Sequence, residues 1–203
     1  MSARKDYREK VILLLRKNGV LRPRDLDACG IPRMVLHRLY QDGYVDKIAR
    51  GLYRLSGGQV SEHCSLAEIS KKIPHGVICL LSSLHYHDLT TQLPFQIWVA
   101  IDRKAHMTII KDIPVRFVRF SGKALTEGVE KHRIDGVTVQ IYNPAKTVAD
   151  CFKYRNKIGL DVALEAMKEC LGNRKCDNDS LWLYAKICRV GNVMRPFLEA
   201  FNA

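Results

Sequence analysis

Three charged residues in the middle of the chain have the types and spacing of a nuclease site. Asp102 and Lys104 follow a β-rich run and match the D-x-K element of metal-dependent nucleases, and Asp88 lies upstream as a second carboxylate. In such a site two carboxylates hold Mg²⁺ and the lysine lies near the attacking water. The D-x-K spacing is common, and the end of a strand is an ordinary place for a charged turn. Metal-dependent cleavage of DNA by Asp102 and Lys104 is therefore kept as the alternative interpretation.

The cysteines and histidines lack the spacing of a metal site. The chain has seven cysteines, which form no C-x-x-C pair: Cys29, Cys64, Cys79, Cys151, Cys170, Cys176 and Cys188. Histidines could join Cys170 and Cys176 as zinc ligands, but none of the separations supports this. The histidines in question are His63, His85 and His87. On a helix His85 and His87 point in different directions, so we expect one to be buried and one exposed. The sequence predicts reduced thiols, no metal and no cofactor.

Residues 32–42 form a helical pattern with one apolar and one polar face. Val35, Leu36 and Leu39 lie together on a helical wheel and are expected to pack against an earlier helix. The opposite face carries the candidate DNA-binding side chains of this helix, which are Arg33, Met34, His37, Gln41 and, at the flank, Arg38. Arginine pairs bidentately with guanine, and methionine can rest on a thymine methyl group. The face has the chemistry for reading bases, although a solvated face without a partner has a similar composition.

The segments around this helix predict a winged helix-turn-helix over residues 1–56. Three successive helical patterns end at Gly19, Gly30 and Gly43, where a left-handed cap costs least. A hairpin follows over residues 44–55, and Gly51 permits the positive φ of its turn. The remaining candidate DNA contacts are Arg22 and Arg24 beside Pro23 at the start of the second helix, and Lys47 and Arg50 near the hairpin tip. Cations in these places usually contact phosphates or the minor groove.

The charge of the chain is uneven along its length. The net charge of the 203 residues is +12. Residues 1–56 hold 13 Lys and Arg against 6 Asp and Glu, so this quarter of the chain carries +7 of the total. Such a concentration favours a polyanionic partner, because each neutralised phosphate releases counterions. The charged start and the shortness of the apolar runs, such as Val77–Leu81, lead us to expect a cytoplasmic protein without a signal peptide or membrane partner.

Three stretches of the chain resemble one known family. GIPRMVLHRLYQDGYVDKIARGLYRL, from Gly30, resembles the N-terminal winged helix of type IV AbiE-type antitoxins, also described as AbiEi-family transcriptional regulators. CLLSSLHYHDLTTQLPFQIWVAI and YNPAKTVADCFKYRNKIGLDVALEAMKE are similar to the antitoxin region that follows it in that family. The resemblance covers roughly residues 7–171. It implies a bacterial repressor that binds its own promoter and counteracts a nucleotidyltransferase toxin encoded beside it, with or without a stable complex.

The rest of the chain predicts an α+β domain. A short linker is expected at Ser56–Gln59, followed by a domain over residues 60–203 with a helical tail from about residue 172. A hairpin is indicated at Ile134–Val137, and Asn143 and Pro144 together are typical of a helix start. The other expected elements are helices over 62–72, 77–89, 161–171, 178–190 and 194–201, and strands over 97–101 and 115–120. The fold class is therefore a winged helix-turn-helix followed by a mixed α/β antitoxin domain.

A run of cations and aromatic residues in the second half is a candidate partner interface. Its residues are Lys146, Lys153, Tyr154, Arg155 and Lys157. A basic and aromatic surface can dock an acidic partner or extend a DNA footprint. The same run also fits a helix whose buried face is formed by Val148, Ala149 and Phe152, with its lysines in water.

The leading interpretation is a DNA-binding repressor and antitoxin without catalytic activity. Its expected partners are double-stranded DNA from its own promoter, bound as a homodimer on an inverted repeat, and the toxin. The alternatives are the nuclease described above and a protein-interaction adaptor whose basic charge is incidental.

Overall fold

The computed structural model describes residues 2–49, 51–56, 63–107, 110 and 113–201. The chain folds into two compact units. The first unit is residues 1–72 with 133–138, and the second is residues 73–132 with 139–203. Most of the expected linker, residues 57–59, lies outside the described residues. The domain boundaries derived from the sequence remain a prediction.

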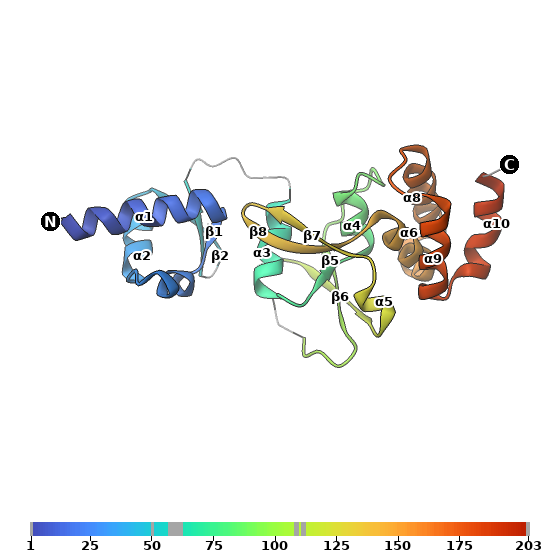
Figure 1. Cartoon of the computed structure of the whole chain (residues 1–203), viewed down its shortest axis with the longest axis horizontal. Helices are drawn as coiled ribbons and strands as arrows, with labels where there is room; N and C mark the ends of the chain where they lie inside the picture. Colours follow the sequence, from blue (N-terminus) through green and yellow to red (C-terminus); the bar gives the residue numbers. More distant parts are fainter. Residues whose placement is uncertain (1, 50, 57–62, 108–109, 111–112, 202–203) are drawn as a thin grey trace. The chain divides into compact units, whose positions relative to one another are not determined.

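The first unit begins with the elements of a winged helix (Figure 1). The helices are α1 (Ser2–Asn18), the 3₁₀ helix η1 (Pro23–Cys29) and α2 (Met34–Gln41). The strands are β1 (Val20–Leu21), β2 (Val45–Ala49) and β3 (Leu52–Leu55), which form an antiparallel sheet in the order β1-β3-β2. The helix α3 (Cys64–Lys72) is also grouped with this unit. The predicted order of helices and hairpin is confirmed, and the short β1 adds a third strand.

Buried aliphatic side chains hold the helices of the winged helix together. Leu36 and Leu39 of α2 and Val11 and Leu15 of α1 are at most 2% exposed and belong to one core cluster. Val35 packs against that cluster while remaining partly exposed. Fully burying a leucine stabilises a fold by about 1.5–3 kcal/mol, so these few contacts fix which face of α2 is left in solvent.

The ends of the helices follow the glycines, but the start of α2 differs from the expectation. Gly19, Gly30 and Gly43 have φ values of 69°, 64° and 75°, the left-handed region that glycine adopts most cheaply. The third helix was expected from Pro32, but α2 begins at Met34. Pro32 instead starts a turn in which its carbonyl accepts the amide of Val35 at 3.0 Å.

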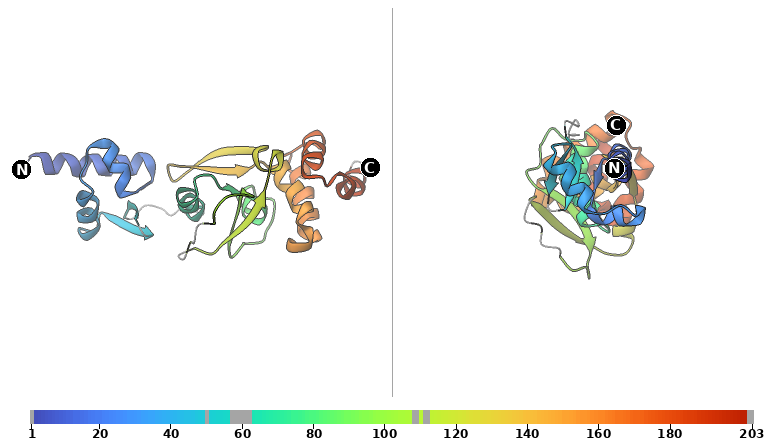
Figure 2. Two further views of the ribbon diagram at one scale, coloured as in Figure 1. Left: turned by 90° about the horizontal axis from the view of Figure 1, so that it is seen from below. Right: turned by 90° about the vertical axis from the view of Figure 1, so that its left-hand side faces the viewer.

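The second unit is built on a mixed five-stranded sheet (Figure 2). In the order β6-β5-β4-β8-β7, the strands are β6 (Val115–Phe120), β5 (Ile97–Asp102), β4 (Val77–Ile78), β8 (Val137–Tyr142) and β7 (Val129–Ile134). β4 runs antiparallel to β5 and parallel to β8, and β5 and β6 are parallel. The tip of the β7–β8 hairpin, residues 133–138, is grouped with the first unit. Mixed pairing with helices on either side in sequence confirms the α+β class.

The helices of the second unit gather mostly at one end of its sheet (Figures 1 and 2). They are α4 (Leu80–Tyr86), α5 (Lys123–Thr126), α6 (Pro144–Lys153), α7 (Arg155–Ile158), α8 (Leu160–Gly172), α9 (Asn178–Cys188) and α10 (Gly191–Phe201). α6 is central and contacts α4, α8 and α9. Its start is as predicted, because the Asn143 side chain accepts the Lys146 amide at 2.8 Å and Pro144 occupies the first turn.

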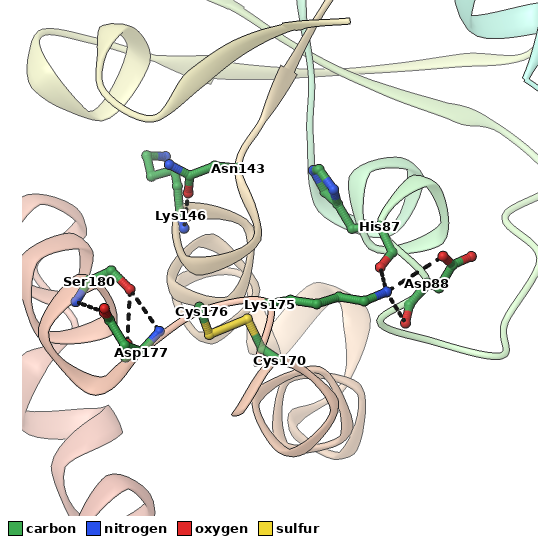
Figure 3. Close-up of a disulfide and its surroundings, with 9 residues drawn as sticks. All are labelled: His87, Asp88, Asn143, Lys146, Cys170, Lys175, Cys176, Asp177 and Ser180. Atoms are coloured by element: carbon green, nitrogen blue, oxygen red, sulfur yellow. Dashed lines mark hydrogen bonds and ion pairs between the residues drawn. A yellow bond between two sulfur atoms is a disulfide. The ribbon is translucent and has the colours of Figure 1, made fainter. Parts of the chain in front are cut away.

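Two expectations for the second unit were wrong. Residues 77–89 do not form one helix, since Val77 and Ile78 make the inner strand β4 and pair with β5. Both residues are β-branched and fit a sheet buried on both faces. Cys170 and Cys176, expected as free thiols, are joined by a disulfide (Figure 3). After α8 the chain turns back so that the amide of Cys176 donates to the carbonyl of Cys170, which brings the two side chains together.

Candidate nucleic-acid interface

The outer face of α2 presents the side chains that were expected to contact DNA. Arg33, Met34, His37, Arg38 and Gln41 are all exposed, whereas Leu36 and Leu39 on the opposite side are buried. Met34, the apolar member of this face, is 62% exposed. The face therefore combines hydrogen-bond donors, one imidazole and one apolar group on about two helical turns.

Arg33 is held by a carboxylate from η1. Its Nε donates to Asp27 Oδ1 and Oδ2 at 2.9 and 3.1 Å, and its Nη2 also donates to Oδ2. This hydrogen-bonded pair lowers the pKa of Asp27 and raises the pKa of Arg33. A guanidinium has five N–H donors, so the Nη1 group still has donors to offer to a base. The pair was not anticipated, although Asp27 and Arg33 flank the Gly30 turn closely in sequence.

Two arginines lie at the start of η1. Arg24 is exposed and Arg22 is half-buried, with its backbone amide donating to Asp25 Oδ2 at 2.7 Å. Burial, followed by the nearby charge of Arg24, lowers the pKa of Arg22. Neighbouring cations of this kind repel each other in the free protein, and an anion such as a phosphate would relieve that repulsion.

The wing contributes one exposed cation among the described residues. Lys47 on β2 is exposed, and Gly51 turns the hairpin with a φ of 74°. Arg54 on β3 forms an ion pair with Asp46 at 3.7 Å, which leaves it less free to contact a phosphate. Arg50, the other predicted wing contact, lies outside the described residues.

The second unit has a pocket lined by cations, which we call the basic pocket. Its volume is about 710 Å³. The charged residues that line it are Arg119, Lys123, Lys153, Lys186 and Arg189, and they are accompanied by the rings of Phe120 and Tyr154. None of its lining residues is acidic. A hollow with this lining favours an anionic group.

The candidate partner residues divide between this pocket and other places. Lys153 and Tyr154 line the pocket, and Lys157 is exposed with its Nζ 5.6 Å from the Tyr154 ring. Arg155 is half-buried and donates from Nη1 to the Phe152 carbonyl at 2.9 Å. Three segments far apart in sequence form the pocket, so neither Arg119 nor Lys186 could be placed there from sequence periodicity.

Lys146 lies in the core and not on the surface. It is fully buried and donates from Nζ to Asp150, with the Nζ also 4.1 Å from the centre of the Tyr142 ring. Asp150 further accepts from Cys188 Sγ at 3.2 Å. Burial raises the pKa of Asp150, while the lysine ammonium opposes that rise. Buried ions of opposite charge compensate each other in this way, so this pair has a structural explanation.

The structure accounts locally for the residues of the nuclease alternative. Asp102 Oδ1 accepts the Lys104 amide at 2.8 Å, as the carboxylate of an ordinary turn does. The Asp88 carboxylate lies 3.5 Å from Lys175 Nζ, which also donates to the carbonyls of His87 and Asp88 (Figure 3). Neither carboxylate belongs to a cluster of three possible metal ligands among the residues that the structure describes.

The histidine pair differs from its expected arrangement. His85 and His87 are both half-buried, where one buried and one exposed ring were predicted. α4 ends at Tyr86, so His87 follows the helix and does not share its periodicity. Burial lowers the pKa of His87. His63 belongs to the first unit and Cys170 to the disulfide, so the zinc ligands considered from sequence do not form a set.

Comparison with known proteins places the winged helix in a family. A search of curated proteins finds no match to the chain. Residues 9–56 match the family described as transcriptional regulator, AbiEi antitoxin. The match spans most of α1, all of η1 and α2, and the β2–β3 hairpin, which are the elements that carry the candidate DNA contacts. It supports a role as an antitoxin and transcriptional regulator. The winged-helix segment of this chain thus matches the AbiEi antitoxin family of transcriptional regulators, as the sequence resemblance predicted.

Proposed function

We propose that this protein represses its own operon by binding promoter DNA and acts as the antitoxin of a type IV system against a nucleotidyltransferase toxin. The observation that carries the proposal is the family match over residues 9–56, which coincides with an exposed, cation-bearing recognition helix. We infer no catalytic step for the chain itself, because regulation and neutralisation both require binding alone.

In this proposal α2 enters the major groove with Arg33, Met34 and His37 toward the bases. Arg33 pairs with guanine through the donors that Asp27 leaves open, and Met34 contacts a thymine methyl group. Arg24 and Lys47 contact phosphates on the two sides of the helix and set its register. Two copies bind as a dimer on an inverted repeat, as helix-turn-helix proteins commonly do.

For the antitoxin activity we assign the basic pocket as the contact surface for the toxin. Its five cations fit an acidic surface on the partner. Lys153 and Lys186 come from α6 and α9, two helices that pack against each other, so their backbone positions are fixed relative to one another.

Two readouts in one host separate the two activities. The operon promoter drives a reporter, and the neighbouring toxin is induced so that growth reports protection. We expect Arg33→Ala combined with Arg38→Ala to lose repression and keep protection. Lys153→Glu combined with Lys186→Glu is expected to lose protection and keep repression. Lys131→Glu combined with Lys168→Glu, at exposed lysines of β7 and α8 outside the pocket, is the charge-matched control and should keep both. If the double pocket variant protects as well as the control, the basic pocket does not contact the toxin. If the α2 variant still represses the promoter, α2 does not recognise the operator.

A further inference from the structure

Two histidines and a glutamate of the second unit come together although they are far apart in sequence. They are His87, which follows α4, and Glu130 and His132 on the edge strand β7. Each offers one ligand atom, and these three atoms all lie within 4.8 Å of one another. Glu130 and His132 are two residues apart on a strand, so their side chains leave the same face. His132 Nε2 is already 3.2 Å from Glu130 Oε2.

A contact with a backbone carbonyl fixes the tautomer of the neutral His87 ring. Its Nε2 is 2.7 Å from the carbonyl oxygen of Tyr142, which can only accept a hydrogen bond. The neutral ring therefore carries its proton on Nε2 and its lone pair on Nδ1. A metal-bound histidine almost always donates its other ring N–H to a carbonyl or carboxylate in this way. The Tyr86 ring lies edge-on to both imidazoles, with centroid distances of 5.2 Å to His87 and 4.9 Å to His132.

The distances suit a small divalent ion after a modest closing movement. Ligand atoms about 2.0–2.2 Å from a tetrahedral zinc ion are about 3.4 Å from one another. The His132–Glu130 separation already meets this value. Glu130 is exposed and His132 is half-buried, so both side chains have room to turn toward His87. Imidazole and carboxylate together suit Zn²⁺ and similar transition metals better than Mg²⁺ or Ca²⁺, which prefer oxygen ligands alone.

Two cations, Arg174 and Lys175, line one pocket together with Glu130. Lys175 lies on the side of the His87 backbone, where its ammonium donates to the carbonyls of His87 and Asp88 (Figure 3). The Asp88 carboxylate is 3.5 Å from that ammonium and offsets its charge. Glu130 supplies one negative charge directly to the site. The alternative explanation is an ion pair between His132 and Glu130 beside packed rings, and it predicts no metal affinity.

We propose that His87, Glu130 and His132 form a zinc-class metal site that links the end of α4 to the edge strand β7. Three protein ligands leave a fourth position of the tetrahedron for water or for a ligand from another molecule. Among the hydrogen bonds found in the described residues, none joins His87 to Glu130 or His132. A bound metal ion would therefore link these two segments. Its role would be to fix the edge of the sheet.

Metal titration of the full-length protein tests this proposal. The chain is stripped with a chelator, exchanged into metal-free buffer and titrated with Zn²⁺ by calorimetry, with melting temperature as a second readout. We expect one equivalent of Zn²⁺ to bind the wild type and to raise its melting temperature. His132→Ala and Glu130→Gln should weaken that binding by at least about tenfold and lose most of the thermal shift. Both residues lie on an edge strand with exposed or half-buried side chains, so these variants avoid the core.

His85→Ala is the matched control, since this histidine is two residues from His87 and is outside the cluster. Cysteines also bind zinc, and Cys29 is exposed, so the titration is repeated in a Cys29→Ser background. The site is supported if His85→Ala and Cys29→Ser still bind zinc and His132→Ala does not. Equal binding by the wild type and His132→Ala, or no binding by either, would overturn it.

Discussion

A single carboxylate sets the orientation of the arginine that we expect to read DNA. Asp27 engages the Nε and Nη2 groups of Arg33, and both residues are exposed. An arginine fixed before binding loses less side-chain entropy when it meets a base. The same carboxylate, however, brings a negative charge close to DNA. Its effect on binding should therefore differ between a specific site and random sequence.

The first prediction concerns Arg33 itself. We expect Arg33→Ala to weaken binding to the operator roughly 5- to 100-fold while changing binding to shuffled DNA much less. Lys47→Ala, which removes a phosphate contact, should weaken both and lower the salt slope by about one unit. Fluorescence anisotropy on the two duplexes measures this. Indistinguishable profiles for the two variants would mean that α2 does not read bases through Arg33.

The second prediction separates orientation from charge. Asp27→Ala should reduce the preference for the operator over shuffled DNA, since Arg33 loses the hydrogen bonds that orient it. The affinity for shuffled DNA should stay equal or rise. Asp42→Ala removes another exposed acid at the end of α2 and is the control for charge. The same anisotropy measurement applies. If Asp27→Ala and Asp42→Ala change the preference for the operator by the same amount, the Asp27 contact does not orient Arg33.

The third prediction concerns the free cysteines. Cys29 is exposed, whereas Cys79, Cys151 and Cys188 are buried. Burial also raises the pKa of all three buried thiols, to about 12 for Cys188, so almost none of their reactive thiolate forms at neutral pH. A thiol reagent at pH 7.5 should label Cys29 first and the buried thiols after unfolding. Peptide mass spectrometry reads the order, and early labelling of Cys151 would contradict the packing around α6.

At the scale of elements, α6 depends on the asparagine that caps it. Asn143 accepts the Lys146 amide, and its side-chain NH₂ donates to Tyr184 Oη at 2.9 Å. Asn143→Ala should lower the free energy of unfolding by about 1 kcal/mol, within the usual 0.5–2 kcal/mol for a lost cap. Denaturant unfolding measures the change. Asn156→Ala, at an exposed asparagine of α7, is the control. If both variants lower the free energy of unfolding equally, the Asn143 cap does not stabilise α6.

The elements that sequence predicted correctly are those with local signals. Asn143 with Pro144 marks a helix start, and Asp135 with Gly136 marks the turn between β7 and β8, where both residues have positive φ. These preferences act within a few residues, so they can be read from short stretches. β4 was missed because Val77 and Ile78 pair with residues more than 20 positions away on β5. A continuous apolar run does not distinguish such a strand from a buried helix.

At the scale of the whole molecule, the two surfaces differ in how far sequence could define them. The α2 face lies on one helix, so its exposed side chains could be listed from a wheel. The basic pocket gathers side chains from β6, from the α5 region and from α6 and α9, and no periodicity links these. For Lys146 the sequence was misleading in the other direction. This lysine belongs to a basic run that was expected at the surface, but it lies in the core next to Asp150. Charge alone does not tell a surface lysine from a buried one.

The surfaces that we propose for DNA and for the toxin lie in separate parts of the chain. The candidate DNA contacts fall within residues 22–50, and the basic pocket and the histidine cluster fall in the second unit. Among the described residues, no helix is long and apolar enough to cross a lipid bilayer. The concentration of net charge in residues 1–56 is consistent with the repressor function that we propose, since it would supply affinity for phosphate in every sequence.

The central claim is that this protein reads a DNA sequence, and binding to its own upstream DNA across a salt series tests it most directly. Fluorescence anisotropy compares that fragment with a shuffled duplex of the same composition. We predict that the upstream fragment binds on the order of 10³-fold tighter or more, and that affinity falls steeply with salt for both duplexes. Equal and weak binding to the two duplexes would contradict the claim.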